Sequence, residues 1–83
     1  MEFSIEKISE LNPEALLADG FTDAIIGMCM QFGQLPVVAY DYYKCIKILQ
    51  DRDGMSKIEA EEYMEYNVVG AYMGLYSPVF IMK

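Results

Sequence analysis

Three stretches of the chain are apolar at successive positions, where a strand with one face in water would alternate apolar and polar residues. They span residues 24–32, 36–40 and 78–82. Because successive side chains of a strand point to opposite sides of its sheet, each stretch would be apolar on both sides. We therefore predict three strands with more apolar surface than two short helices cover. A homodimer would cover the rest, and the residues expected at its interface are Ile25, Met28, Met30, Val38 and Phe80.

A helix is predicted directly after the second strand. Asp41 is placed to act as its N-cap, and Gly54 supplies the left-handed residue that ends it. Its apolar positions follow the i, i+3, i+4, i+7 spacing of one helix face. That stripe consists of Tyr42, Cys45, Ile46 and Leu49.

A second helix is predicted from a capping box, in which Ser56 stands three residues before Glu59. Its apolar side includes Ala60 and Met64. The β-branched pair before Gly70 weakens the helix there, and Gly74 is its outer limit.

The N-terminal segment, residues 1–20, carries two short helical signals. Ile5, Ile8 and Leu11 are three positions apart, and a further helix is expected over residues 14–18. With 83 residues, the chain has room for one domain. We expect an α+β fold, in which two main helices pack on one face of a small, mainly antiparallel three-stranded sheet.

The net charge of −7 is concentrated in the first 23 residues and in the second predicted helix. A field of this sign repels phosphate backbones, so direct nucleic-acid binding is not expected. A basic protein surface is the natural partner if the charge has a role in binding, and the alternative is a solvated acidic face that only keeps the protein soluble. Tyrosine, of which the chain has seven, is common in interfaces. The surface predicted to bind a partner consists of Glu61, Glu62, Glu65, Tyr63 and Tyr66, and the second choice is Tyr40, Tyr42 and Tyr43.

Candidate chemistry is sparse. The chain has no histidine, which excludes the commonest general base and metal ligand, and it has no glycine-rich phosphate loop. Asp51 to Gly54 resembles part of a calcium loop, but the ligand positions fail, because Leu49 and Ala60 stand at the first and twelfth. We expect no enzyme activity, no cofactor and no metal. Cys29 and Cys45 are read as reduced, buried residues of a cytosolic protein without a signal peptide or membrane span.

Several segments resemble small acidic proteins of bacteriophages and prophages that have no established activity. The similarity covers residues 17–82, and it is carried by the segments LADGF at 17–21, PVVAYDY at 36–42, RDGMS at 52–56 and NVVGAY at 67–72. The resemblance implies an accessory phage protein in the cytosol of a bacterial host.

The function expected from these observations is stoichiometric binding to a host macromolecule, for instance inhibition of a bacterial defence or nucleic-acid-handling protein. One alternative is a sponge for a small molecule, such as a nucleotide signal, held at a dimer interface. Its cations would be Lys44, Lys47 and Arg52. The other alternative is a structural or assembly component of the phage.

Overall fold

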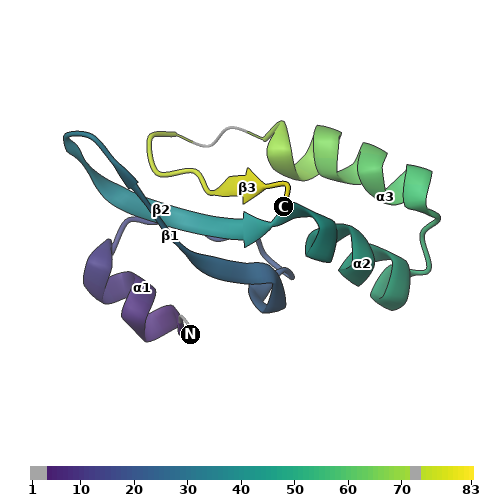
Figure 1. Ribbon diagram of the computed structural model, residues 1–83, viewed down its shortest axis with the longest axis horizontal. Coiled ribbons are helices and arrows are strands. Elements are labelled where there is room, and N and C mark those ends of the chain that lie inside the picture. Colours follow the sequence, from purple (N-terminus) through teal and green to yellow (C-terminus); the bar gives the residue numbers. More distant parts are fainter. Residues whose placement is uncertain (1–3, 72–73) are drawn as a thin grey trace.

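The computed structural model describes residues 4–71 and 74–83, which form three helices, two short helical turns of other types and a three-stranded sheet. Figure 1 shows α2 and α3 side by side at the end of the sheet where β2 ends, while α1 lies nearer the hairpin. In chain order the elements are α1 (Ile5–Leu11), the 3₁₀ turn η1 (Thr22–Ala24), β1 (Ile25–Gln31), β2 (Gln34–Asp41), α2 (Tyr42–Asp53), α3 (Lys57–Tyr63), the π-helical segment η2 (Met64–Val69) and β3 (Val79–Ile81).

The sheet has the order β1–β2–β3, so β2 is central. β1 and β2 form an antiparallel hairpin in which Met28 lies opposite Val38, whereas β3 joins β2 in parallel and places Phe80 beside Tyr40. A parallel neighbour needs a crossover, and α2, α3 and η2 provide it. The expected α+β class and the three strands are confirmed.

The signals at the helix ends work as the sequence indicates. The Asp41 carboxylate accepts a hydrogen bond from the backbone N–H of Lys44 at 3.2 Å, and Gly54 ends α2 in the left-handed region with φ 68°. Ser56 and Glu59 form the predicted capping box of α3, with reciprocal hydrogen bonds of 2.8 and 3.1 Å. The helix then widens into η2, which ends at Val69 before Gly70.

The core lies between one face of the sheet and the helices. Val38 and Tyr40 are fully buried at its centre, and the stripes of α2 and α3 pack on them. The buried cluster consists of Ile8, Phe21, Ala24, Val38, Tyr40, Cys45, Ile46, Leu49, Ala60 and Met64.

The helix expected over residues 14–18 does not form, and this expectation was wrong. Tertiary partners bind the backbone groups that a helix would pair internally: the N–H of Leu16 donates to the carbonyl of Tyr76, and that of Ala18 to the Tyr40 hydroxyl. Asn12, which is buried, starts the segment by accepting from the N–H of Glu14 and donating to the carbonyl of Pro36. The segment is therefore held across the sheet as irregular chain.

Over residues 4–71 and 74–83, none of the helices combines the length and the apolar character that a bilayer crossing requires.

Candidate functional site

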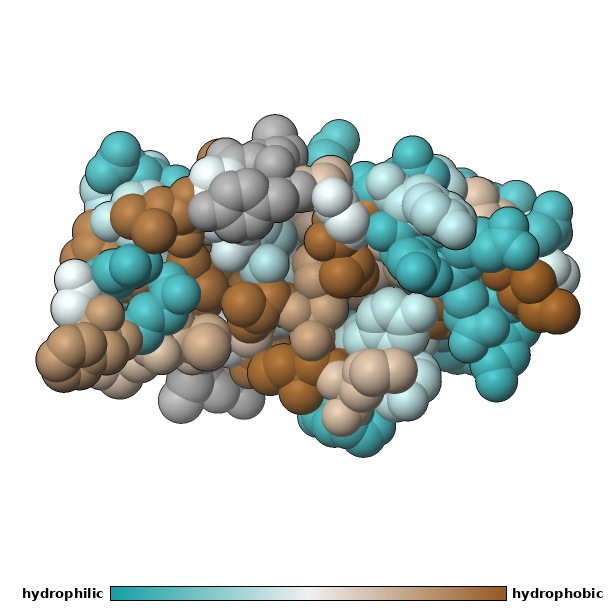
Figure 2. All heavy atoms as spheres, turned by 90° about the horizontal axis from the view of Figure 1, so that it is seen from above, coloured by the Kyte–Doolittle hydropathy of each residue, from teal (hydrophilic) through white to brown (hydrophobic). Residues whose placement is uncertain are grey.

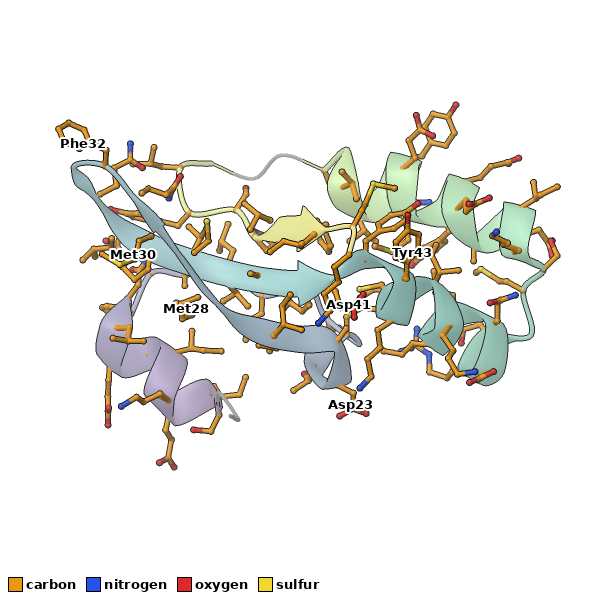
Figure 3. The ribbon with its side chains drawn as sticks, viewed as in Figure 1. Asp23, Met28, Met30, Phe32, Asp41 and Tyr43 are labelled. Atoms are coloured by element: carbon orange, nitrogen blue, oxygen red, sulfur yellow. The ribbon has the colours of Figure 1, made fainter. Side chains whose placement is uncertain are left out.

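The two most exposed large apolar side chains of the described chain lie at the turn between β1 and β2. Phe32 is completely exposed (104 % of its reference area), Met30 is 88 % exposed, and Leu35 is exposed beside them. We call these three residues the hairpin tip. Figure 3 shows Phe32 projecting from the end of the hairpin, away from the body of the protein.

The hairpin tip is held by a tight connection. Gln31 and Gln34 pair directly across it, and Gly33 adopts φ 72°, in the left-handed region that glycine enters without strain. Phe32 is thus presented on a short turn of defined geometry. An aromatic side chain placed in this way loses little conformational freedom when a partner covers it.

The distribution of charge along the hairpin agrees with the apolar character of its tip. No charged residue lies between Asp23 and Asp41, and Figure 3 places both aspartates at the opposite end of the hairpin from Phe32. In Figure 2 hydrophobic residues gather over the hairpin half, whereas the surface over α2 and α3 is mostly hydrophilic. On this face of the molecule, the hairpin half is therefore more apolar than the half formed by α2 and α3.

The residues expected at a dimer interface do not share one open face, because α1, α2, α3 and the segment before β1 cover that side of the sheet. Val38 is 0 % exposed within the single chain, which corrects its placement at an interface. Ile25 and Met28 pack against the core, and the Phe80 ring stacks on Tyr40 at a centroid distance of 5.4 Å. Met30 is the member of the set that is exposed.

The five residues expected to bind a partner are divided between two sides of the helix formed by α3 and η2. Glu62, Glu65 and Tyr66 are exposed, Tyr66 to 75 %, and these three form what we call the acidic face. Glu61 is half-buried near Tyr42; burial first, and then the charges of Glu61 and Glu65, raise the pKa of the Tyr42 hydroxyl. Tyr63 instead lines a cavity on another side of the helix.

The second-choice tyrosines are also separated. Tyr40 is buried, and burial raises the pKa of its hydroxyl despite the hydrogen bond from Ala18. Tyr42 is half-buried, and its ring meets that of Tyr43 edge-on at 5.5 Å. Tyr43 is the one of the three that is exposed.

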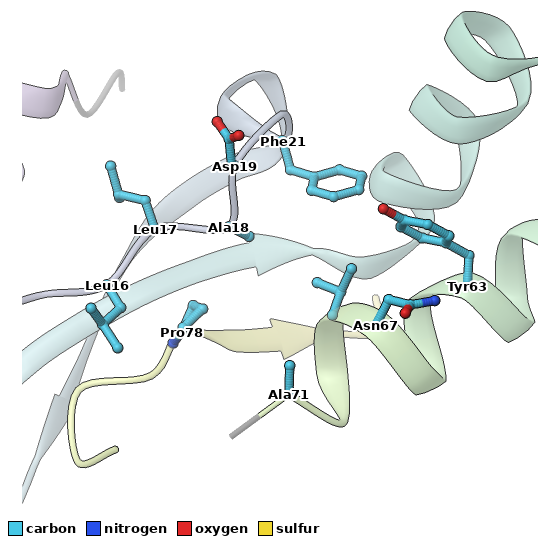
Figure 4. A pocket seen from close by; sticks show the side chains of 10 residues that line it. Leu16, Leu17, Ala18, Asp19, Phe21, Tyr63, Asn67, Ala71 and Pro78 are labelled. Atoms are coloured by element: carbon cyan, nitrogen blue, oxygen red, sulfur yellow. The ribbon is translucent and has the colours of Figure 1, made fainter. Parts of the chain in front are cut away.

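A cavity of about 300 Å³ lies between the segment preceding β1 and the end of the α3–η2 helix (Figure 4). We refer to it as the hollow. Most of its lining residues are apolar, and Asp19, Tyr63 and Asn67 are the polar residues among them. Its lining is Leu16, Leu17, Ala18, Asp19, Phe21, Tyr63, Asn67, Val68, Ala71 and Pro78.

Arg52 ties the segment before β1 to the end of α2. Its Nη1 donates to the Gly20 carbonyl at 2.8 Å, its Nε and Nη2 bind the Asp53 carboxylate at 3.0 Å each, and its guanidinium lies 5.7 Å from the centre of the Phe21 ring. The hydrogen bonds with Asp53 raise the pKa of Arg52 and lower that of Asp53.

Two of the three cations considered for a nucleotide already have acidic partners within the chain. Arg52 is engaged as described, and Lys47 pairs with Asp51 at 3.7 Å along α2. The turn from Asp51 to Gly54 is accounted for by these two ion pairs and the helix end. Within the described ranges, no group of three or more His, Cys, Asp or Glu side chains is arranged to hold a metal ion.

The Cys45 thiol is not activated. Burial, with a smaller contribution from the Asp41 charge, raises the pKa of the Cys45 thiol to about 12. It is thus protonated at neutral pH and a poor nucleophile. Cys29 is half-buried in β1.

Compared with protein-family models, curated proteins and solved structures, the chain matches none of them. The assignment of function therefore depends on its own residues.

Sequence reasoning named Met30 as an interface residue but missed Phe32, and it missed the hollow. A signal for the first was present, since a two-residue turn usually carries glycine, asparagine or aspartate, and here Phe32 precedes Gly33. The hollow left no such signal, because its walls come from residues 16–21, the α3–η2 helix and Pro78, which are far apart in the sequence.

Proposed function

We propose that the protein acts by binding another protein stoichiometrically, with the hairpin tip as the anchor of the contact. Given the resemblance to bacteriophage and prophage proteins, the partner is a protein of a bacterial host. Inhibition of a defence or nucleic-acid-handling protein is the form of action that suits such a binder. No catalytic step is part of this proposal.

The complete exposure of Phe32 is the observation that carries the proposal. Leaving a phenylalanine and a methionine in water forgoes about 25 cal/mol for each Å² that could be buried. Aromatic residues and methionine are enriched in the centres of protein interfaces, and a few such residues supply most of the binding energy. The short turn adds geometric definition, which reduces the entropic cost of docking.

The acidic face indicates that the partner contributes a basic surface to the contact. Glu62 and Glu65 are exposed there, and the whole chain carries a net charge of −7. Complementary charge speeds the encounter of two proteins, whereas desolvated apolar contacts mainly determine how long they stay together. The hairpin tip and the acidic face would then perform different parts of one binding process.

The experiment is affinity capture from bacterial lysate with matched variants, followed by mass spectrometry and purification of the captured protein. The wild type should retain one dominant host protein in a complex of fixed integer stoichiometry. Phe32→Ser should lose this protein while the free energy of unfolding changes by about 0.5 kcal/mol or less, because Phe32 makes no core contact. Ile58→Ser is the control, since Ile58 is also apolar and 68 % exposed but lies in α3.

The outcome of this comparison is decisive in either direction. Loss of the complex in both variants would point to general surface hydrophobicity and contradict the hairpin tip as the anchor. Retention of the complex by Phe32→Ser, or no dominant partner with the wild type, would also contradict the proposal.

We propose, second, that two copies of the chain associate through the same hairpin tip. The observation in favour is the absence of charge between Asp23 and Asp41, since an uncharged surface brings no like charges of two acidic copies into direct contact. Light scattering at micromolar concentration should give a dimer mass for the wild type and a monomer mass for Phe32→Ser. A monomer mass for the wild type would exclude the homodimer. If both proposals hold, the host protein should dissociate the dimer, because both occupants need the same residues.

A further inference from the structure

The outer edge of β1 is open to a further strand. β2 is central in the sheet, so β1 and β3 are its two edge strands. None of the seven residues of β1 is buried, whereas β2 has four buried residues. Over the described residues 4–71 and 74–83, no hydrogen bond from outside the hairpin reaches the backbone of residues 26–31. The backbone groups along such an edge are able to pair with a strand of another chain.

β1 lacks the features that commonly protect an edge strand. Edges are often made short, or they carry a proline or a charged side chain that hinders pairing with other chains. β3 has two of these features, since it is three residues long and directly follows Pro78. β1 is seven residues long and contains neither a proline nor a charged residue. Of the two edges, β1 is therefore the one to which another strand would add.

The pairing with β2 shows which part of β1 is regular. Ile26 is an extra residue, because its two neighbours in β1 pair with consecutive positions of β2. Such a bulge interrupts regular pairing along the edge at that point. The irregularity nearer the turn has its extra residue in β2, so β1 continues regularly over residues 27–31. Cys29, which is half-buried, is the midpoint of this regular stretch.

The distribution of charge favours a second copy of the chain as the added strand. The whole chain carries a net charge of −7, but residues 24–40 carry no charge. Two β1 strands would therefore meet without opposing like charges, whereas a basic segment of another protein would find no carboxylate along this strand. Antiparallel pairing of two identical edges also uses the same surface on both copies, so the assembly closes at two.

We infer that two copies of the chain pair antiparallel along β1, with Cys29 opposite the second copy's Cys29, so that their two sheets form one. Counting outward from Cys29, Met30 lies opposite the second copy's Met28, and Phe32 reaches its Ile26. The exposed side chains of Met30, Phe32 and Ile26 thus gain apolar neighbours across the new pairing. This inference rests on the dimer proposed above, to which it gives a register that includes the hairpin tip.

Thiol cross-linking of the full chain tests this register, because it brings the two native Cys29 side chains together. At micromolar concentration, a short bis-maleimide should convert most of the protein to a species of twice the mass, measured by mass spectrometry. Cys29→Ser should lose this product, because the remaining Cys45 is 0 % exposed. Ile58→Cys in the Cys29→Ser background places a thiol at an exposed position of α3. It should cross-link at least tenfold more slowly than the wild type, because only random collisions bring two such thiols together.

A charge at the midpoint of β1 tests the same contact without a reagent. Cys29→Lys places two positive charges opposite each other, so the dissociation constant of the dimer should rise at least tenfold. Cys29→Ser is the neutral control and should remain a dimer. Met82→Lys, which adds the same charge at an exposed apolar position outside β1, should also remain a dimer. Analytical ultracentrifugation gives the constants, and circular dichroism verifies that each variant is folded.

The outcomes separate this inference from the proposal on which it rests. A monomer mass for the wild type removes the dimer and the edge pairing together. A wild-type dimer that does not cross-link through Cys29, or that persists in folded Cys29→Lys, overturns the edge pairing and leaves the dimer standing. Equally fast cross-linking by the Ile58→Cys variant overturns it as well. Should Cys29→Lys fail to fold, the cross-linking of the wild type decides.

Discussion

The Tyr40 hydroxyl accepts a hydrogen bond of 2.8 Å from the backbone N–H of Ala18. Tyr40 is the last buried residue of β2, and Ala18 belongs to the irregular segment before β1 and also lines the hollow. This contact therefore joins the centre of the sheet to one wall of the hollow.

Replacing Tyr40 by phenylalanine should lower the free energy of unfolding by about 1–2 kcal/mol. The ring and its stacking on Phe80 would remain, but the N–H of Ala18 would lose its partner in a partly buried place. Urea denaturation followed by circular dichroism measures the loss. Tyr43→Phe is the control, since Tyr43 is exposed, and its effect should be close to zero. Equal stability of the two variants would show that the hydrogen bond contributes nothing.

The capping box of α3 should make part of the stability depend on pH. The backbone N–H of Ser56 lowers the pKa of the Glu59 carboxyl below its ordinary 4.5. The ionised form is thus the one that the fold stabilises: the contribution is present above pH 4.5 and is lost as the pH falls through the lowered pKa.

Glu59→Gln measures this contribution, because glutamine keeps a side-chain acceptor at the same position without a titrating group. The wild type should exceed the variant in stability at neutral pH, and the difference should shrink as the pH falls below 4.5. Glu62→Gln, on the same helix but away from the cap, controls for the loss of one negative charge. A wild-type advantage that stays constant with pH would contradict the linkage.

The carboxylates of the α3–η2 helix have two alternative roles, and one triple substitution distinguishes them. If Glu61, Glu62 and Glu65 only solvate the surface, changing all three to Gln should alter stability by about 0.5 kcal/mol or less per site and leave partner binding intact. If they attract a basic partner, the change should slow association strongly at low salt and less at high salt. Stopped-flow mixing at several salt concentrations distinguishes the two.

Truncation of Tyr66 should act on a different rate. As a 75 % exposed aromatic side chain beside the acidic residues, it would be desolvated in a complex, so Tyr66→Ala should mainly speed dissociation. Surface plasmon resonance gives this rate directly. An unchanged dissociation rate, together with salt-insensitive association, would leave the hairpin tip as the only candidate contact.

The fold should be indifferent to divalent cations. Asp51 and Asp53 are paired with Lys47 and Arg52, and the turn they flank is explained by the end of α2. Millimolar Ca²⁺ or Zn²⁺ should therefore leave the melting temperature unchanged. A rise of several degrees that a chelator reverses would reveal a metal site.

Local sequence signals were sufficient to predict most of the helices and strands. Asp41 and Gly54 fixed the two ends of α2, and the Ser56–Glu59 box fixed the start of α3, because caps act between residues close in the sequence. The segment from 14 to 18 was misjudged since its backbone donors bind Tyr76 and Tyr40, and no local pattern encodes such partners. For the same reason Val38 was placed at an interface, although the single chain covers it completely.

The sites were harder to predict than the elements. Composition indicated an acidic, tyrosine-rich helix, but it did not show which way each side chain points. Tyr63 was therefore grouped with Glu62, although it faces the hollow. The hollow itself depends on how distant segments meet. A sequence without aligned relatives carries no trace of that arrangement.

The parallel pairing of β3 with β2 has a consequence for the order of assembly. β1 and β2 are neighbours in the chain and close a short loop, whereas β3 reaches β2 only after α2, α3 and η2 have been made. Short loops close fast and long ones slowly, so the uncharged hairpin should form early and await its third strand and its helices. During synthesis that interval exposes its apolar side to other chains. The nascent protein is thus most prone to associate with other chains before β3 docks. Rapid formation of α2 protects it, because this helix packs on the apolar side of the hairpin.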